Sequence, residues 1–296
     1  MPTHPFRLPT VDFVYVLQIL RLPDPYRTIS VVEGLQLMIE ALPCLQYVQY
    51  EPWRGVNDAR QYHMITQYGA FITVMSHCKH LRRVHIFEPV TSTMSSGLKI
   101  RTEALGLGPL LARRSAALEA LIVCFAVNAM HFFWDLRPTS GLNLADRLYW
   151  ANLREVLLTS DELQPRSPST VQVIDWASRA VARMPQIQIM EIFNVETRKH
   201  VLNPHATIFA YVVLGPDQFP AIIVSSTWGW RLQSTEIWPW AHVASMDPRT
   251  RAELRVQYVD LKREDLPRTN SVFCHLAMCD VVRTRKTTRG VRKLLE

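Results

Sequence analysis

The phrase Leu45-Gln-Tyr-Val48-Gln-Tyr50 has the pattern of a β-strand, and the chain repeats that pattern at a nearly constant spacing. Phrases with the same apolar positions begin at four later residues: Leu81, Leu118, Leu153 and Ile187. Successive starts are separated by 36, 37, 35 and 34 residues, and a further step of 34 toward the N-terminus reaches Val11. A fixed period of this size predicts a protein built from stacked repeats. Such proteins commonly serve as binding surfaces for a large partner.

An amphipathic helix is predicted ahead of most of these strands. In residues 169–184, one helical face carries the apolar side chains of Val173, Trp176, Ala177, Ala180 and Met184. Ser169 and Gln172 fit a capping box at the start of this helix, and Pro185 would end it. Residues 30–42 follow the same scheme. The repeating unit is therefore expected to be a helix, a tight turn, a strand and a loop.

This unit predicts the fold class, because neither its helix nor its strand can bury an apolar face alone. Stacked units would form a parallel sheet on one face and a layer of helices on the other. The period of 34–37 residues exceeds the roughly 20–29 of ordinary leucine-rich repeats, and the Asn positions of that class are not regular here. We therefore expect an irregular, leucine-rich-repeat-like α/β solenoid that forms a single domain over residues 1–296, with clear repeats in 11–194.

The pattern changes after residue 194. Two strands of a hairpin, a helix, a strand and a helix are expected at 206–213, 221–228, 236–244, 254–261 and 271–282. We interpret residues 195–282 as modified C-terminal repeats or a cap, and residues 283–296 as a basic tail.

Composition favours a soluble intracellular protein, cytoplasmic or nuclear. No apolar run reaches the length of a membrane span, and the N-terminus lacks the layout of a secretory signal. Five scattered cysteines fit free thiols in a reducing compartment. The net charge of +7 comes largely from residues 283–296, a patch that nucleic acid could bind but that also fits a solvated terminus. Because no aromatic stacking platform accompanies the patch, nucleic acid is not the expected partner.

Two groups of residues are candidates for partner binding. Trp228-Gly-Trp230 and Trp238-Pro-Trp240 place four tryptophans within 13 residues, and tryptophan is enriched in binding hot spots. Packing across the hairpin and the following helix is the commoner use of such residues. Tyr50-Glu-Pro-Trp-Arg54 follows the second strand, where Glu51 and Arg54 could face a partner, pair with each other or cap the next helix. The candidate set is Tyr50, Glu51, Trp53, Arg54, Trp228 and Trp230.

No motif of the sequence predicts catalysis, a cofactor or a metal. There is no Gly-x-Ser-x-Gly elbow, P-loop or His-Glu-x-x-His. His77-Cys78-Lys79-His80 lacks the second ligand pair that zinc commonly needs. Gly106-Leu-Gly108-Pro109 is not a dinucleotide fingerprint and is better interpreted as a loop that opens a helix. We therefore do not expect an enzyme.

Several stretches resemble a known family. Residues 29–54, which end in Tyr50-Glu-Pro-Trp-Arg54, are similar to filamentous-fungal F-box proteins with a leucine-rich-repeat-like region of uncharacterised function. Residues 81–88, 118–133, 184–194 and 227–232 fit the same family. The resemblance implies substrate recognition in a Skp–cullin–F-box ubiquitin ligase and supplies no catalytic residue. The F-box itself is missing from these residues, which makes the Skp adaptor a doubtful partner and leaves an unidentified protein as the expected one.

Three alternatives to a protein-interaction module stay open. The first is a basic adaptor that contacts nucleic acid through the tail, and the second is a pathway enzyme with a pocket in the Trp-rich C-terminal region. The third is a truncated, non-functional paralogue. The apolar strand expected at Phe13–Leu20 has little chain before it to cover its outer edge, so we expect self-association.

Overall fold

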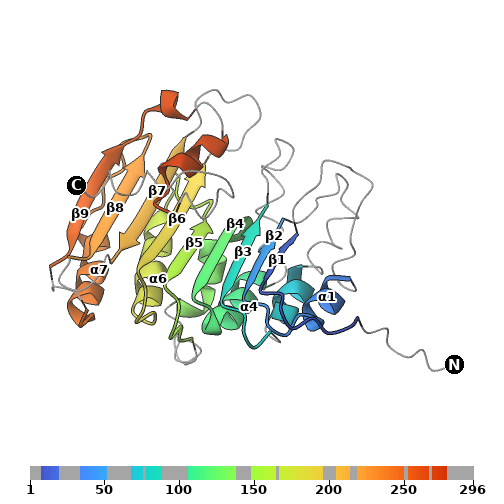
Figure 1. Ribbon diagram of the computed structural model, residues 1–296. Helices are drawn as coiled ribbons and strands as arrows, with labels where there is room; N and C mark the ends of the chain where they lie inside the picture. Colours follow the sequence, from blue (N-terminus) through green and yellow to red (C-terminus); the bar gives the residue numbers. More distant parts are fainter. Residues whose placement is uncertain are drawn as a thin grey trace.

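The computed structural model describes residues 8–19, 34–51, 68–75, 78–88, 106–137, 148–164, 167–195, 205–213, 219–249, 253–266 and 269–278. Its framework is one open sheet of nine strands that lie side by side in chain order, from β1 to β9. Figure 1 shows this sheet with helices α1, α4, α6 and α7 along one side. The expected α/β architecture with a mostly parallel sheet is therefore present.

The first six strands are parallel, as the repeated phrases predict. Their bounds are β1 Val16–Ile19, β2 Tyr47–Tyr50, β3 Arg83–Phe87, β4 Ala120–Asn128, β5 Glu155–Thr159 and β6 Ile189–Val195. Across β2 to β6 the register joins Tyr47, Arg83, Ala120, Glu155 and Ile189. Each of these is the third residue of its phrase, so the phrase itself sets the register.

The placement of the first phrase at Val11 is wrong. Val16 of β1 pairs with Tyr47, which makes Val14 the residue equivalent to Leu45. Val11 lies before the strand, where its backbone N–H donates to the carbonyl oxygen of Ala41 at 2.8 Å. Val11, Val14 and Leu17 follow one another at intervals of three residues. The apolar pattern therefore fits a phrase that begins at Val11 as well as one that begins at Val14, and it cannot distinguish these two registers.

The C-terminal strands change direction, and the predicted hairpin at 206–213 and 221–228 is present as β7 and β8. β7 (Ala206–Val212) runs antiparallel to β6, and β8 (Ala221–Ser226) runs antiparallel to β7. β9 (Arg255–Asp260) returns parallel to β8. The sheet therefore continues through the C-terminal third without a break.

The helices cover one face of the sheet. They are α1 (Gln36–Glu40), a helical stretch at 68–75, α4 (Leu107–Arg114), α5 (Ala129–Phe132), α6 (Thr170–Val181) and α7 (Ser234–Met246). Short 3₁₀ helices are η2 (Ser115–Ala117), η3 (Trp134–Leu136), η5 (Arg263–Asp265) and η6 (Thr269–His275). The expected α-helix at 271–282 is therefore a 3₁₀ turn in its described part. No helix within the described ranges is long and apolar enough to cross a membrane.

The capping box predicted at Ser169 does not form. Ser169 has helical dihedrals, with φ −82° and ψ −9°, and its side chain makes no capping hydrogen bond. A capping residue normally has an extended backbone, which turns its side chain toward the free N–H groups. Gln233 meets this requirement with φ −81° and ψ 161°, and it forms a capping box with Glu236 at the start of α7.

Gly106 and Gly108 open helix α4, as expected for a loop that leads into a helix. Gly106 has φ 57°, a left-handed conformation that favours glycine. A Cβ atom at Gly108 would lie 2.3 Å from the carbonyl carbon of His131. The close packing of α4 against α5 therefore requires glycine at this position.

Two hydrophobic cores lie on opposite faces of the sheet. The larger core lies between the sheet and the helices, and it takes the first, fourth and sixth residues of each phrase, such as Leu45, Val48 and Tyr50. The smaller core contains Ile122, Leu157 and Phe193, which point the other way because side chains alternate along a strand. We call the face that carries the smaller core the strand face.

Candidate protein-interaction face

The register aligns side chains in rows across the strand face. One row runs through Gln18, Gln49, His85, Ile122, Leu157 and Glu191. The neighbouring row runs through Val16, Tyr47, Arg83, Ala120, Glu155 and Ile189. Apart from Val16, the rows are polar over β1 to β3, and they are mostly apolar over β4 to β6, so the strand face has two chemically different areas.

The polar area is a connected hydrogen-bond network. The Gln18 amide donates to Gln49 Oε1 at 3.1 Å, and the Tyr47 hydroxyl donates to the same oxygen at 3.1 Å. The Tyr47 hydroxyl oxygen also lies 2.9 Å from His85 Nδ1. Because a phenol has one proton, donation to Gln49 leaves its oxygen to accept a hydrogen bond from Nδ1–H. That tautomer places a lone pair on His85 Nε2.

His85 is the buried end of this network. Its side chain is 7% exposed, and Nε2 has no hydrogen-bond partner in the structure as described. Burial, followed by the nearby Arg83 guanidinium, lowers the pKa of His85 to about 4. The imidazole is therefore neutral near pH 7, and its Nε2 atom is a hydrogen-bond acceptor.

The apolar area is covered by the chain's own C-terminal residues. We call Leu266 and residues 269–278 the C-terminal segment. Five of its side chains belong to the smaller core: Leu266, Val272, Phe273, Leu276 and Met278. In Figure 1 the red C-terminal turns lie near β6. The central part of the strand face is thus occupied.

Four aromatic rings form the centre of this contact. Phe273 packs edge-on against Phe87, Phe125 and Phe193, with ring centroids 5.6, 6.1 and 5.8 Å away. Such edge-to-face pairs each contribute roughly 0.5–1.5 kcal/mol beyond the area that they bury. Phe273 is therefore the main side-chain anchor of the C-terminal segment.

Phe125 reaches this cluster through an unusual backbone conformation. It has φ 62°, which a non-glycine residue adopts at a cost of about 1–3 kcal/mol. The regular pairing of β4 with β5 is interrupted between Val123 and Asn128, and the Phe125 N–H instead donates to Thr159 Oγ1 at 2.9 Å. The interruption places Cys124 and Phe125 in the same core although they are adjacent in sequence.

Glu191 fixes the C-terminal segment through its backbone. Its carboxylate accepts hydrogen bonds from the N–H groups of Ala277 at 2.7 Å and Met278 at 2.9 Å. Burial raises the pKa of Glu191 to about 7, and the two N–H donors only partly oppose this. Burial, and then the charge of Glu191, raise the pKa of Cys124, which keeps that thiol protonated.

Sequence reasoning missed both Glu191 and the polar network. Glu191 lies between Met190 and Ile192 in an otherwise apolar strand, and that isolated charge was the available signal. The network residues occupy the third and fifth positions of their phrases, which alternation turns away from the helices.

Of the predicted site residues near β2, the structure describes Tyr50 and Glu51. Tyr50 is buried on the helix side, where its ring lies 6.3 Å from Tyr68 and 4.8 Å from Phe71. Glu51 is half-buried at the end of β2, and its N–H donates to the carbonyl oxygen of Ile19 at 2.9 Å. Trp53 and Arg54 lie outside the described residues. Partner binding by this group stays a prediction.

Three of the four clustered tryptophans pack within the fold. Trp228 and Trp230 stack with centroids 5.7 Å apart, and Trp228 Nε1 donates to Thr207 Oγ1 at 2.7 Å. Trp230 is 8% exposed, and Trp240 packs on the rings of Phe209 and Tyr211. Only Trp238 is largely exposed, and it stacks on His242. Packing across the hairpin and α7 therefore explains Trp228, Trp230 and Trp240.

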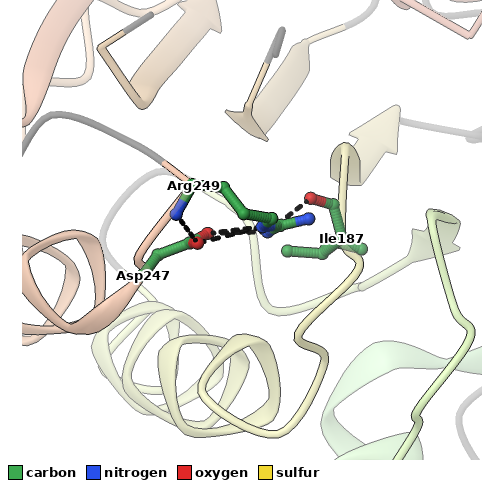
Figure 2. Close-up of polar contacts among 3 residues, drawn as sticks. All are labelled: Ile187, Asp247 and Arg249. Carbon is green, nitrogen blue, oxygen red and sulfur yellow. Dashed lines mark hydrogen bonds and ion pairs between the residues drawn. The ribbon is translucent and has the colours of Figure 1, made fainter. Parts of the chain in front are cut away.

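An ion pair lies directly after helix α7. Figure 2 shows the Arg249 guanidinium bonded to both carboxylate oxygens of Asp247 and donating to the carbonyl oxygen of Ile187, 3.1 Å away. Burial acts to raise the pKa of Asp247, but the bonds from Arg249 outweigh it and lower that pKa. The pair connects the end of α7 to the turn that leads into β6.

No metal centre is found in the described part of the chain: no three His, Cys, Asp or Glu residues there are grouped so that they could hold an ion. Cys78 lies at the end of the helical stretch 68–75, with Sγ 3.9 Å from the carbonyl oxygen of Val74. Burial, and then the charge of Glu40, raise the pKa of the Cys78 thiol to about 11.

These features define an α/β protein with an open, mostly parallel sheet. Helices cover one face of the sheet, and the C-terminal segment covers part of the strand face. Residues 76–283 match the model of a family of unknown function (DUF6546), and the chain belongs to this family. The matched region contains β3 to β9 and the C-terminal segment. No curated protein and no solved structure matches the chain.

Proposed function

We propose that this protein is a protein-interaction module and that its partner docks on the polar area of the strand face, over β1 to β3. We also propose that the fold is an irregular, leucine-rich-repeat-like solenoid. The common register of β2 to β6 and the helices along one face support it. Solenoids of this kind offer extended surfaces for recognition.

The observation that carries the proposal is the hydrogen-bonded network on the strand face of β1 to β3. Gln18 and Arg83 are exposed and Tyr47 is half-exposed, while Gln49 and His85 on the same face are buried. The buried residues hold Tyr47 in one orientation, so little side-chain freedom is lost when a partner binds. Arg83 offers a cation, and a guanidinium binds carboxylates well. We therefore expect a partner surface with an acidic residue opposite Arg83.

The resemblance to fungal F-box proteins supports a more specific role. In that role the strand face recognises substrates of a Skp–cullin–F-box ubiquitin ligase. The adaptor and the cullin would then accompany the protein in cells, whereas a free-standing interaction module would bring only its own partner.

Affinity purification with quantitative mass spectrometry tests the proposed function. The tagged chain is compared with Arg83→Glu and with the control Arg114→Glu, which makes the same charge change on an exposed residue of α4. We expect Arg83→Glu to reduce the recovery of a specific partner at least tenfold and Arg114→Glu to leave it unchanged. Recovery of the same proteins in equal amounts by all three would contradict docking over β1 to β3.

The same samples also test whether the protein acts in a ubiquitin ligase. Enrichment of the Skp adaptor and a cullin with the unmodified chain is the result expected for a ligase component. Reproducible recovery of another partner without them would contradict the ligase role and leave the interaction module. The basic tail, on which the nucleic-acid alternative depends, lies outside the described residues.

A further inference from the structure

The apolar area of the strand face binds a segment of the chain itself, and we call this area the groove. It lies over β4 to β7, and its sheet residues include Ile122, Phe125, Leu157, Phe193 and Ile208. Phe87 extends it to β3, two residues beyond His85 of the polar network. The groove is therefore continuous with the area where the partner is proposed to dock.

The groove holds its occupant through backbone groups. Glu191 accepts the N–H groups of Ala277 and Met278 and contacts neither side chain through these bonds. Any polypeptide with the same local conformation could supply two such donors.

Specificity in the groove comes from apolar side chains. The Phe273 ring fits among three other phenylalanine rings, and Leu276 and Met278 follow it into the same core. Cys274, directly after Phe273, is exposed. The last three occupied positions, Phe273, Leu276 and Met278, thus define the pattern Phe-x-x-Leu-x-Met.

Two features reduce the cost of emptying the groove. The occupant is a 3₁₀ helix of seven residues, longer than the three or four that such helices usually reach, so it depends on its contacts with the sheet. Glu191 is also buried beneath it, and burial of a carboxyl group away from water carries a desolvation cost. When the C-terminal segment leaves, water solvates Glu191, which offsets part of the lost apolar burial.

We propose that the C-terminal segment is an intramolecular ligand of this groove, and that a partner segment with the pattern Phe-x-x-Leu-x-Met, or close apolar equivalents, displaces it. The proposal rests on the proposed function, because it names the kind of partner segment that an interaction module of this shape would take. In the resting protein the groove is closed by its own chain. Binding of the partner segment opens the C-terminal segment.

A synthetic peptide tests this proposal without any cellular partner. The probe is a fluorescein-labelled peptide with the sequence of residues 266–278, titrated with the full-length chain and followed by fluorescence anisotropy. The Phe273→Ala variant weakens the internal occupant, so we expect it to bind the peptide at least tenfold more tightly than the unmodified chain does. Adding Phe125→Ala, which removes one wall of the groove, is expected to abolish this gain. The control Cys274→Ala, at an exposed neighbour, is expected to behave like the unmodified chain.

Hydrogen exchange on the unmodified chain provides a second, independent readout. The Ala277 and Met278 amides donate to Glu191, and we expect them to exchange at least a hundredfold faster than the paired amides of β5 and β6. Equal protection of both sets would show that the C-terminal segment opens only when the whole protein unfolds, and it would overturn the proposal. A folded Phe273→Ala variant with no gain in peptide affinity would overturn it as well. Either failure leaves the docking test at Arg83 untouched, so the two proposals fail separately.

Discussion

Glu191 has a pKa that its surroundings shift strongly. Its carboxyl group is 1% exposed, and burial raises its pKa from 4.5 to about 7. Compared with the unfolded chain, the folded state therefore favours the protonated form of Glu191. The stabilisation from this group is fully present below the unfolded pKa and is lost as the pH rises through the folded one.

The free energy of unfolding is accordingly expected to contain a contribution from Glu191 that falls between about pH 4.5 and pH 7. The shift corresponds to a loss on the order of 3 kcal/mol. Urea denaturation across this range measures it, and the Glu191→Gln variant should lack this part of the pH dependence because an amide does not titrate there. Identical pH profiles for the two proteins would contradict the burial effect.

The pKa of His85 is also strongly shifted, and its effect on stability has the opposite sign. Burial lowers its pKa from the ordinary 6.5 to about 4. Its stabilisation is present above pH 6.5 and is lost as the pH falls through the folded pKa, because the unfolded chain takes up the proton first. An NMR titration of the His85 ring is expected to have its midpoint near pH 4, with the proton on Nδ1 at neutral pH. A midpoint near pH 6.5, or a proton on Nε2, would be inconsistent with the network.

Sequence reasoning identified residue types at this scale but not their directions. Tyr50 and Trp230 are aromatic residues near predicted loops, yet both are buried. Tyr47 and Gln49, a few residues earlier, lie on the strand face because they occupy alternate positions of the phrase. The direction of a side chain follows from the two-residue period of the strand. Whether that side chain is buried depends on chain segments that are distant in sequence and leave no local signal.

Among the elements, α7 provides the clearest test of local stabilisation. Gln233 and Glu236 form a reciprocal capping box at its start. Losing a capping side chain typically costs about 0.5–2 kcal/mol. We expect Gln233→Ala to reduce the free energy of unfolding in urea by this amount.

The matched control for this substitution is Gln172→Ala in α6. Gln172 is exposed near the start of a helix whose capping residue makes no side-chain hydrogen bond. The same change of residue is therefore expected to have little effect there. Equal effects of the two substitutions would mean that the capping box does not stabilise α7.

Strands were easier to predict than helix starts, for a physical reason. The phrase repeats the same apolar positions, and stacking forces equivalent positions into register, so β2 to β6 follow directly from it. The start of α6 depends instead on the backbone conformation of Ser169, which residue type does not determine. The cover over β4 to β7 depends on residues that lie 86 and 87 positions after Glu191.

At the scale of the whole molecule, β1 is an edge strand of the sheet. Its surroundings include exposed apolar side chains: Phe13 is 78%, Tyr15 51% and Val16 52% exposed. An apolar edge strand tends to pair with another chain. We therefore expect the apparent mass in light scattering to rise with protein concentration.

The double substitution Phe13→Lys with Val16→Lys is expected to suppress this self-association, because charged side chains on an edge strand oppose pairing. Trp238→Lys is the control, since Trp238 is 69% exposed but lies on a helix. A constant monomer mass for the unmodified chain at all concentrations would contradict the edge-pairing prediction.

Site-specific photo-crosslinking tests most directly whether the strand face is the docking surface. A benzophenone amino acid is placed in living cells at Gln18, which is exposed on the strand face, or at Gln172, which is exposed on α6. We predict that position 18 captures a distinct protein and that position 172 does not. Capture of the same proteins from both positions, or of only a second copy of this chain from position 18, would contradict docking on the strand face.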